Sequence, residues 1–133
     1  MRKRLSLVGL LIVMSLGLSG CALFTAVLDD SDDGALQSLR VGETVRIELD
    51  GNITAGFEWA RIDPDTLDAS PLRVLTEGEY RACDNPNVVG EGGTYVFRYR
   101  ATEPGTVVLR FVYRKPSEPD LIEDTYEVTV WVH

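Results

Sequence analysis

The sequence predicts an all-β domain, an Ig-like antiparallel β-sandwich of about seven strands. Two observations favour this fold class. Apolar and polar residues alternate with period two in most segments after residue 37, and Gly, Pro, Asn and Asp gather between those segments. No amphipathic helical stripe of useful length follows residue 20. The domain is therefore assigned to residues 37–133, behind a leader (1–20) and a flexible tether (21–36).

The leader is similar to a bacterial lipoprotein signal peptide. Residues 2–4 are basic, and residues 5–18 form an apolar run that is shorter than the roughly 20 residues of a membrane-spanning helix. Leu18-Ser19-Gly20-Cys21 resembles a lipobox, which implies that Cys21 carries acyl chains such as palmitate and begins the mature protein. Two chains suffice for stable attachment. Ala22 after the cysteine suggests the outer membrane, facing the periplasm or the surface. The alternative is an ordinary secretory leader with an incidental cysteine.

The segment before the domain is expected to be a solvated tether, because residues 29–33 are acidic and show no apolar periodicity. A calcium loop counted from Asp29 would place Arg40 at position twelve, where a bidentate glutamate is required. We therefore predict no metal site here, and no cofactor elsewhere.

Removal of the leader would leave a strongly acidic chain. Three of the 13 basic residues lie in the leader and all 21 acidic residues follow it, which gives a net charge near −11. Such a chain repels nucleic-acid phosphates, so no nucleic-acid partner is expected, and the domain should also stay clear of anionic lipid headgroups despite its lipid anchor. With Cys21 acylated, Cys83 has no partner for a disulfide. We expect a monomer.

The strands and their connections follow from the alternating pattern. Residues 76–93 predict a long irregular connection because they lack periodicity. Residues 115–120 contain two prolines and predict a stiff loop. The strands are expected at residues 45–50, 57–62, 72–75, 94–101, 106–114 and 125–132.

The sequence argues against an enzyme. Its single histidine, His133, is the last residue, where a catalytic base would be poorly held. Clustered His and Cys ligands for zinc are absent, and Gly90-Glu91-Gly92-Gly93 opens a predicted strand rather than the helix of a phosphate-binding loop.

Three predicted connections resemble the inhibitory loops of the chagasin family of cysteine peptidase inhibitors. Asn52-Ile53-Thr54-Ala55-Gly56-Phe57, with Trp59 beyond it, is similar to that family's Asn-Pro-Thr-Thr-Gly-Tyr/Phe loop. Gly90-Glu91-Gly92-Gly93 is similar to its Gly-x-Gly-Gly loop, and Tyr113-Arg114-Lys115-Pro116 stands in place of its Arg-Pro-Trp/Phe loop. The resemblance covers about residues 38–132. It implies reversible, non-covalent inhibition of papain-like cysteine peptidases by three loops wedged into the active-site cleft.

On this resemblance Thr54 and Gly56 would approach the target's catalytic Cys and His, and the glycines would allow close backbone contact, although simple turn geometry also explains them. Three departures stand out: Ile53 replaces proline, Ala55 replaces a threonine, and Ser117 replaces the aromatic anchor. They predict weaker or differently selective inhibition. They also favour the alternative, an Ig-like envelope lipoprotein that binds a structural or surface partner without inhibiting a peptidase.

Overall fold

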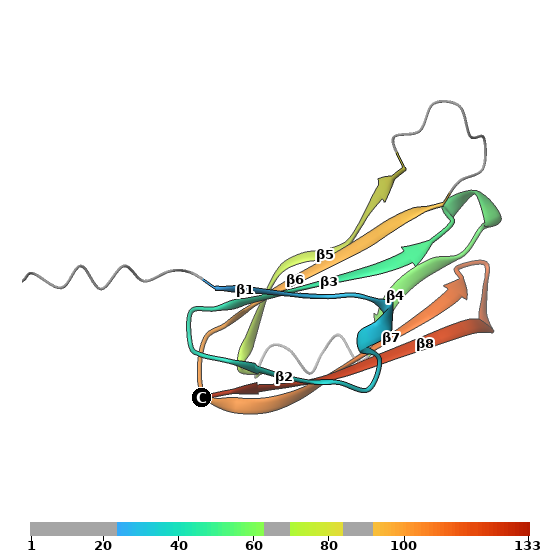
Figure 1. Ribbon diagram of the computed structural model, residues 1–133. Helices are drawn as coiled ribbons and strands as arrows, with labels where there is room; N and C mark the ends of the chain where they lie inside the picture. The colour runs from blue at the N-terminus through green and yellow to red at the C-terminus, as the bar shows by residue number, and fades with distance from the viewer. Residues whose placement is uncertain (1–23, 63–69, 84–91) are drawn as a thin grey trace, which may run out of the picture.

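The computed structural model describes residues 24–62, 70–83 and 92–133, which form two four-stranded sheets packed face to face (Figure 1). One sheet has the strand order β1-β3-β6-β5 and the other β2-β8-β7-β4. This confirms the predicted all-β sandwich. The elements, in chain order, are β1 (Thr25–Leu28), η1 (Asp30–Asp32), β2 (Leu36–Leu39), β3 (Thr44–Gly51), η2 (Ile53–Ala55), β4 (Glu58–Ile62), β5 (Leu72–Ala82), β6 (Gly93–Ala101), β7 (Gly105–Lys115) and β8 (Glu118–Val132).

The core lies between the sheets and is made by the apolar residues of the period-two pattern. Successive side chains of a strand point to opposite faces, so alternation gives each sheet one apolar face. The rings of Phe97 on β6 and Phe111 on β7 meet across the two layers, with centroids 4.6 Å apart. The largest fully buried side chains are those of Tyr99, Phe97, Phe111, Leu39, Ile47, Leu49, Leu72 and Leu109.

The prediction of a tether is wrong for residues 25–36. The strand β1 pairs in parallel with β3 and is an edge strand of its sheet, and β2, which begins at Leu36, pairs in parallel with β8 at the edge of the other sheet. Ala26 and Leu28 are 6% and 7% exposed and belong to the core. The sheets are therefore mixed rather than wholly antiparallel, and the described residues hold eight strands rather than seven.

The acidic run is an ordered connection between the two sheets. Asp29 caps η1 by accepting a hydrogen bond from the Ser31 nitrogen at 2.8 Å. Asp33 accepts from the Glu127 nitrogen of β8 at 2.8 Å, and Asp30 accepts from the Asp50 nitrogen of β3 at 3.2 Å. Hydrogen bonds from backbone amides thus explain why these three acidic residues lie so close together at this point.

Two connections are shorter than predicted because the strands continue past the core. The strand β5 extends to Ala82, with register shifts between Val74 and Thr76 and between Thr76 and Glu79. These irregularities break the period-two pattern and made its second half read as a loop. Likewise β8 begins at Glu118, so the predicted 115–120 loop reduces to a turn at Pro116 and Ser117. Residues 118–125 are exposed and lack the apolar alternation of a core strand.

The described ranges include no helix long and apolar enough to cross a membrane. The predicted leader, the acylation site Cys21 and two residues of the second loop, Gly90 and Glu91, lie outside the described residues.

Candidate functional site

Strand pairing brings three connections to one end of the sandwich (Figure 1). Gly51, at the end of β3, is opposite Gly93, at the start of β6, and Gly93 is opposite Ala82, at the end of β5. In the second sheet, Glu58 at the start of β4 is opposite Arg114 near the end of β7. The predicted loop residues 52–57, 92–93 and 113–116 therefore lie at a common end although they are far apart in the sequence.

The central loop is held by its own hydrogen bonds. Asn52 is the N-cap of η2, and its side-chain oxygen accepts from both the backbone nitrogen (3.0 Å) and the hydroxyl of Thr54. The Ala55 nitrogen donates to the Asn52 carbonyl at 3.2 Å, and the Gly56 nitrogen donates to the Ile53 carbonyl at 3.1 Å. The loop thus has a defined shape even though Ile53 stands where a proline would stiffen the backbone.

Gly56 ends η2 in the left-handed conformation, with φ 80° and ψ 12°. Among the described residues, a Cβ built on it would have only the Lys115 Cε within contact distance, at 3.9 Å. Glycine is thus favoured here by backbone conformation and not by crowding. Ile53, Thr54, Ala55 and Gly56 are all exposed, so the loop forms a projecting tip rather than the wall of a cavity.

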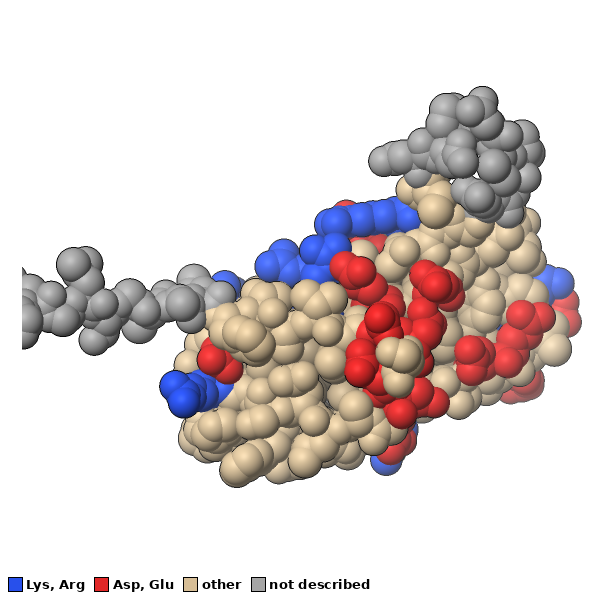
Figure 2. Space-filling model, viewed as in Figure 1, with Lys and Arg blue, Asp and Glu red and all other residues tan. Residues whose placement is uncertain are grey.

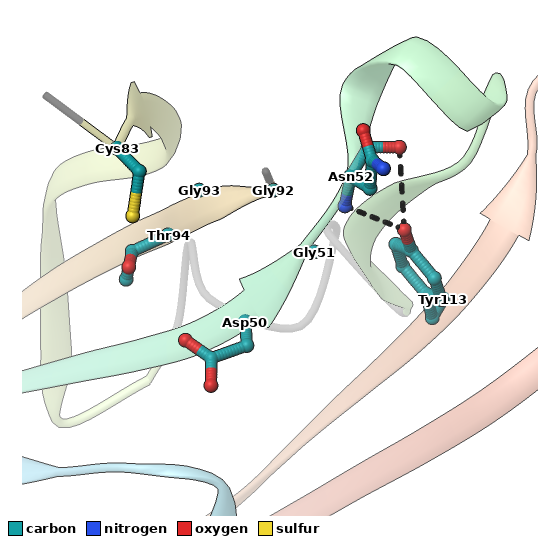
Figure 3. Close-up of a pocket in the computed structure, with 8 residues that line it drawn as sticks. All are labelled: Asp50, Gly51, Asn52, Cys83, Gly92, Gly93, Thr94 and Tyr113. Carbon is teal, nitrogen blue, oxygen red and sulfur yellow. Dashed lines mark hydrogen bonds between the residues drawn. The ribbon is translucent and has the colours of Figure 1, made fainter. Parts of the chain in front are cut away.

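Aromatic side chains support this tip from below. The Tyr113 hydroxyl accepts a hydrogen bond from the Asn52 nitrogen at 2.8 Å, and the Tyr113 ring lies 5.5 Å from that of Phe57 and 5.3 Å from that of Trp59. The Tyr95 hydroxyl donates to the Phe57 carbonyl at 3.1 Å. Tyr113, predicted to bind the target, is half-buried and holds the central loop in place (Figure 3). Nothing in the sequence indicates this role of Tyr95 beyond its place on an aromatic face.

Trp59 completes this support. It is 4% exposed, and its ring nitrogen donates to the Asp50 carbonyl at 2.9 Å, which ties β4 to the end of β3. Burial raises the pKa of the Tyr95 hydroxyl to about 12, so this hydroxyl remains a hydrogen-bond donor to the loop over the whole physiological range.

The described glycines of the second loop are required by packing inside the fold. A Cβ on Gly92 would lie 2.5 Å from the Gly51 carbonyl oxygen, and one on Gly93 would collide with the Arg81 carbonyl oxygen and the Tyr80 ring. For these two residues, close strand packing is a sufficient reason for glycine. Gly90 and Glu91 of the predicted loop are not described.

The third loop is the turn of a long hairpin. Lys115 forms an ion pair with Glu118 at 3.0 Å, and Pro116 and Ser117 make the exposed turn. Arg114 is opposite Ile122 of β8. Leu121 and Ile122 are 45% and 49% exposed beside this turn, and sequence reasoning missed them. The feature of the sequence that could have identified them is an apolar pair inside an acidic segment.

A pocket of about 480 Å³ separates the central loop from the ends of β5 and β6 (Figure 3). Asn52 and Tyr113 line one side and Cys83 and Thr94 the other. Cys83 is exposed and forms no disulfide with any residue that the structure describes. In the described ranges no group of His, Cys, Asp or Glu is arranged to hold a metal ion.

The sequence matches the profile described as chagasin family peptidase inhibitor I42 over residues 38–130, which is most of the chain. The chain belongs to the chagasin family. It is 32% identical over 85 residues to chagasin of Trypanosoma cruzi, a match that covers 63% of this chain and 76% of that protein. The crystal structure of the cysteine protease inhibitor EhICP2 of Entamoeba histolytica aligns with TM-score 0.70 at 17% identity, covering 82% of this chain and 96% of the other.

A further solved structure, that of PbICP-C in complex with falcipain-2, aligns with TM-score 0.53 at 20% identity. The alignment covers 84% of this chain and 93% of that one. As a member of the chagasin family, the chain is a peptidase inhibitor and not an enzyme. The family match includes the central loop and the β7–β8 turn. The strand β1 precedes the matched residues and is not part of the match.

Proposed function

We propose that this chagasin-family chain reversibly inhibits papain-like cysteine peptidases. The projecting 52–57 loop would enter the active-site cleft of the peptidase, and the second loop and the β7–β8 turn would contact the peptidase on either side of it. One observation carries the proposal: the exposed tip Ile53–Gly56 lies between Asn52 and Phe57, which are hydrogen-bonded to the hydroxyls of Tyr113 and Tyr95. A protruding tip that is rigid before binding loses little conformational entropy when it enters a concave site.

Inhibition would need no covalent chemistry from the chain. The Thr54 side-chain oxygen and the left-handed Gly56 backbone are both at the tip, where they would cover the target's catalytic residues. Because Gly56 has open space beside it, a peptidase side chain or backbone can approach this point closely.

The exposed pair Leu121 and Ile122 would supply the apolar contact that Ser117 cannot make. An apolar anchor buried at such an interface is commonly worth about 2 kcal/mol or more. Arg114 and Lys115 lie next to this pair on β7, so the third loop would combine an apolar patch with positive charge. This combination would change selectivity without removing inhibition.

The finer parts of the proposal concern attachment and location. Residues 1–20 would be removed as a lipoprotein signal peptide, and Cys21 would be acylated and would hold a monomeric inhibitor at the cell envelope, in the outer membrane facing the periplasm or surface. Thr25 is opposite Thr44 at the start of β3, whereas the central loop follows Gly51 at its end. That arrangement would leave the inhibitory end of the domain pointing away from the anchor.

The test is a titration of papain and of a cathepsin L-type peptidase with the chain from residue 21 onward, carrying Cys21→Ser. We expect stoichiometric, reversible loss of activity, and weakening by at least about 100-fold when Thr54→Arg and Gly56→Arg are combined, since bulky charge at the tip holds it off the cleft. A folded chain that leaves both peptidases active at micromolar concentration would instead favour binding to a structural or surface partner.

A further inference from the structure

The outer face of the β1-β3-β6-β5 sheet carries four arginines close together, near the end at which β1 begins. Arg46 is directly opposite Arg98, and Arg100 is directly opposite Arg73. Their neighbours along β3 and β6 are buried core residues, so these four side chains share the opposite, outward face. We call Arg46, Arg73, Arg98 and Arg100 the arginine face.

This arrangement has a cost that the rest of the molecule avoids. Like charges placed directly opposite each other on adjacent strands destabilise a sheet. Arg46 is paired with Glu48, but Arg73, Arg98 and Arg100 form no ion pair within the described part of the chain. Of the other strand arginines, Arg61, Arg81 and Arg110 each have an acidic partner there, whereas Arg114 of β7 has no ion pair among the described residues.

Acidic side chains gather on other parts of the surface. Figure 2 shows Lys and Arg grouped along the edge of the molecule formed by this sheet, with Asp and Glu in the middle of the visible face and along the β7–β8 side. On the outer face of this sheet the sign of the charge changes along the strands. Nearer the loops, the residues opposite Val96 on the neighbouring strands are acidic, Glu48 on β3 and Glu79 on β5. The chain's net charge of −8 therefore does not describe this face.

Distance decides which charges a neighbouring surface would experience. At an ionic strength of 0.1 M the screening length is about 10 Å, so charges on remote faces are largely screened. A flat anionic surface in contact with the arginine face would interact mainly with the guanidinium groups of Arg73, Arg98 and Arg100, because Glu48 compensates the charge of Arg46. Net acidity alone thus does not keep the domain away from anionic headgroups.

We propose that the arginine face binds the phosphates of an anionic lipid surface. Lipid is favoured as the partner because β1 begins close to Cys21. This step rests on the lipid attachment proposed at Cys21. Thr25 begins β1 in the same row as Arg100, so only residues 22–24 separate Cys21 from this row, at most about 14 Å of extended chain. A domain anchored so closely must present some face to the headgroups.

The apolar side chain of Val27 adds to this face. It is 60% exposed and pairs with Arg46, so it lies in the row that continues to Arg98. An exposed valine between an anchor and two arginines suits the boundary between headgroups and acyl chains. The inhibitory tip follows the far end of β3, about 24 Å along an eight-residue strand, and remains free for a peptidase.

The test uses the chain from residue 21 onward with Cys21→Ser, so that acylation contributes nothing to binding. All described strands lie in this chain. It is mixed at 0.1 M salt with 2 mM lipid as vesicles of phosphatidylglycerol and phosphatidylethanolamine, or of phosphatidylcholine alone, and co-sedimentation is measured. Each arginine near an anionic surface raises the partition coefficient roughly fivefold.

We expect binding to the anionic vesicles only, and a loss of about 25-fold when Arg73→Gln and Arg100→Gln are combined. The matched control combines Arg40→Gln and Arg110→Gln, two exposed arginines outside the arginine face with the same change in net charge, and should bind nearly as the parent chain does. Removal of the Arg73–Arg100 opposition should leave the melting temperature unchanged or raised.

The proposal is overturned if the parent chain does not sediment with the anionic vesicles, or if the two double variants lose binding equally. Papain inhibition by the same preparations reports separately on the proposed function. A chain that inhibits papain but does not bind vesicles would disprove only the lipid-binding face, and the reverse result would disprove only the inhibitory role.

Discussion

The hydroxyl of Tyr113 lies 2.8 Å from the backbone nitrogen of Asn52 and 3.4 Å from its carbonyl oxygen, so it both accepts from and donates to the residue that caps the central loop. This contact joins the β7–β8 hairpin to the β3–β4 connection across 61 residues of sequence. Two of the three predicted loops are therefore coupled through one side chain.

Tyr113→Phe should keep the ring contacts with Phe57 and Trp59 and remove both hydrogen bonds. We expect the free energy of unfolding to fall by about 1 kcal/mol and the inhibition constant for papain to rise several-fold, because the Asn52 nitrogen loses its acceptor. Urea denaturation and papain titration measure the two effects. Tyr80→Phe is the control, since its hydroxyl has no hydrogen bond within the described ranges. Equal effects of both substitutions would contradict a supporting role for Tyr113.

Gly56→Ala and Gly93→Ala should distinguish the two reasons for glycine at this end of the sandwich, which are backbone conformation at Gly56 and close packing at Gly93. Gly56 has a φ of 80° and open space, so alanine should cost about 1 kcal/mol of stability through backbone strain. Alanine at Gly93 would collide with the Arg81 carbonyl oxygen and should cost more, about 3 kcal/mol. Chemical denaturation of both variants gives the comparison. A greater loss at Gly56 than at Gly93 would argue against this assignment.

Leu121→Ser combined with Ile122→Ser should weaken papain inhibition by about 30-fold or more and leave stability nearly unchanged, because both side chains are half exposed in the free chain. Leu36→Ser, at a 66% exposed leucine on β2, is the control for surface hydrophobicity. The measurement is the inhibition constant for papain of the parent chain, the double variant and the Leu36→Ser variant. If the double substitution has no more effect than the control, the pair takes no part in the third loop's contact.

Stability should fall as the pH rises from about 10 to about 12. The pKa of Tyr95 is raised by burial from 10 to about 12, so below pH 10 the hydroxyl is protonated in both folded and unfolded chains. Above pH 10 the unfolded chain releases this proton first, and the stabilising contribution is lost as the pH approaches 12. Tyr95→Phe should show a shallower fall when unfolding by urea is followed at several pH values. Parallel curves for parent and variant would contradict the raised pKa.

Leu28→Ala tests the correction of the predicted tether. Because Leu28 is 7% exposed and packs in the core from β1, its truncation should cost about 2 kcal/mol, whereas a residue of a solvated tether would cost nothing. Val27→Ala, on the exposed side of the same strand, provides the comparison and should have little effect on stability. Thermal unfolding of both variants is sufficient. Unchanged stability for Leu28→Ala would support the original prediction that this segment is a solvated tether.

Local patterns in the sequence were enough to identify the sandwich. The alternation in segments such as 45–50 and 125–132 predicted two-faced strands, because a period of two is the direct consequence of pleating. The spacing of the Asn-x-Thr-x-Gly segment, the Gly-Gly pair and the Tyr-Arg-Lys-Pro segment indicated the family, because turn residues have specific backbone requirements that can be read locally.

Other features depended on contacts between distant segments. The strand β1 has only four residues and does not alternate apolar with polar side chains, so its sequence does not distinguish it from a spacer, and only its pairing with β3 makes it part of the fold. Register shifts concealed the second half of β5, and the long β7–β8 hairpin brought Leu121 and Ile122 beside the third loop.

The sequence by itself determined the fold class, the family and the acidity of the chain, because each follows from local pattern or composition. Tertiary structure alone decided that Tyr113 supports the central loop, that Gly92 and Gly93 are fixed by packing, and that four arginines from three strands share one face. Strand register sets these relationships, and register arises from pairing between residues that are far apart in the chain.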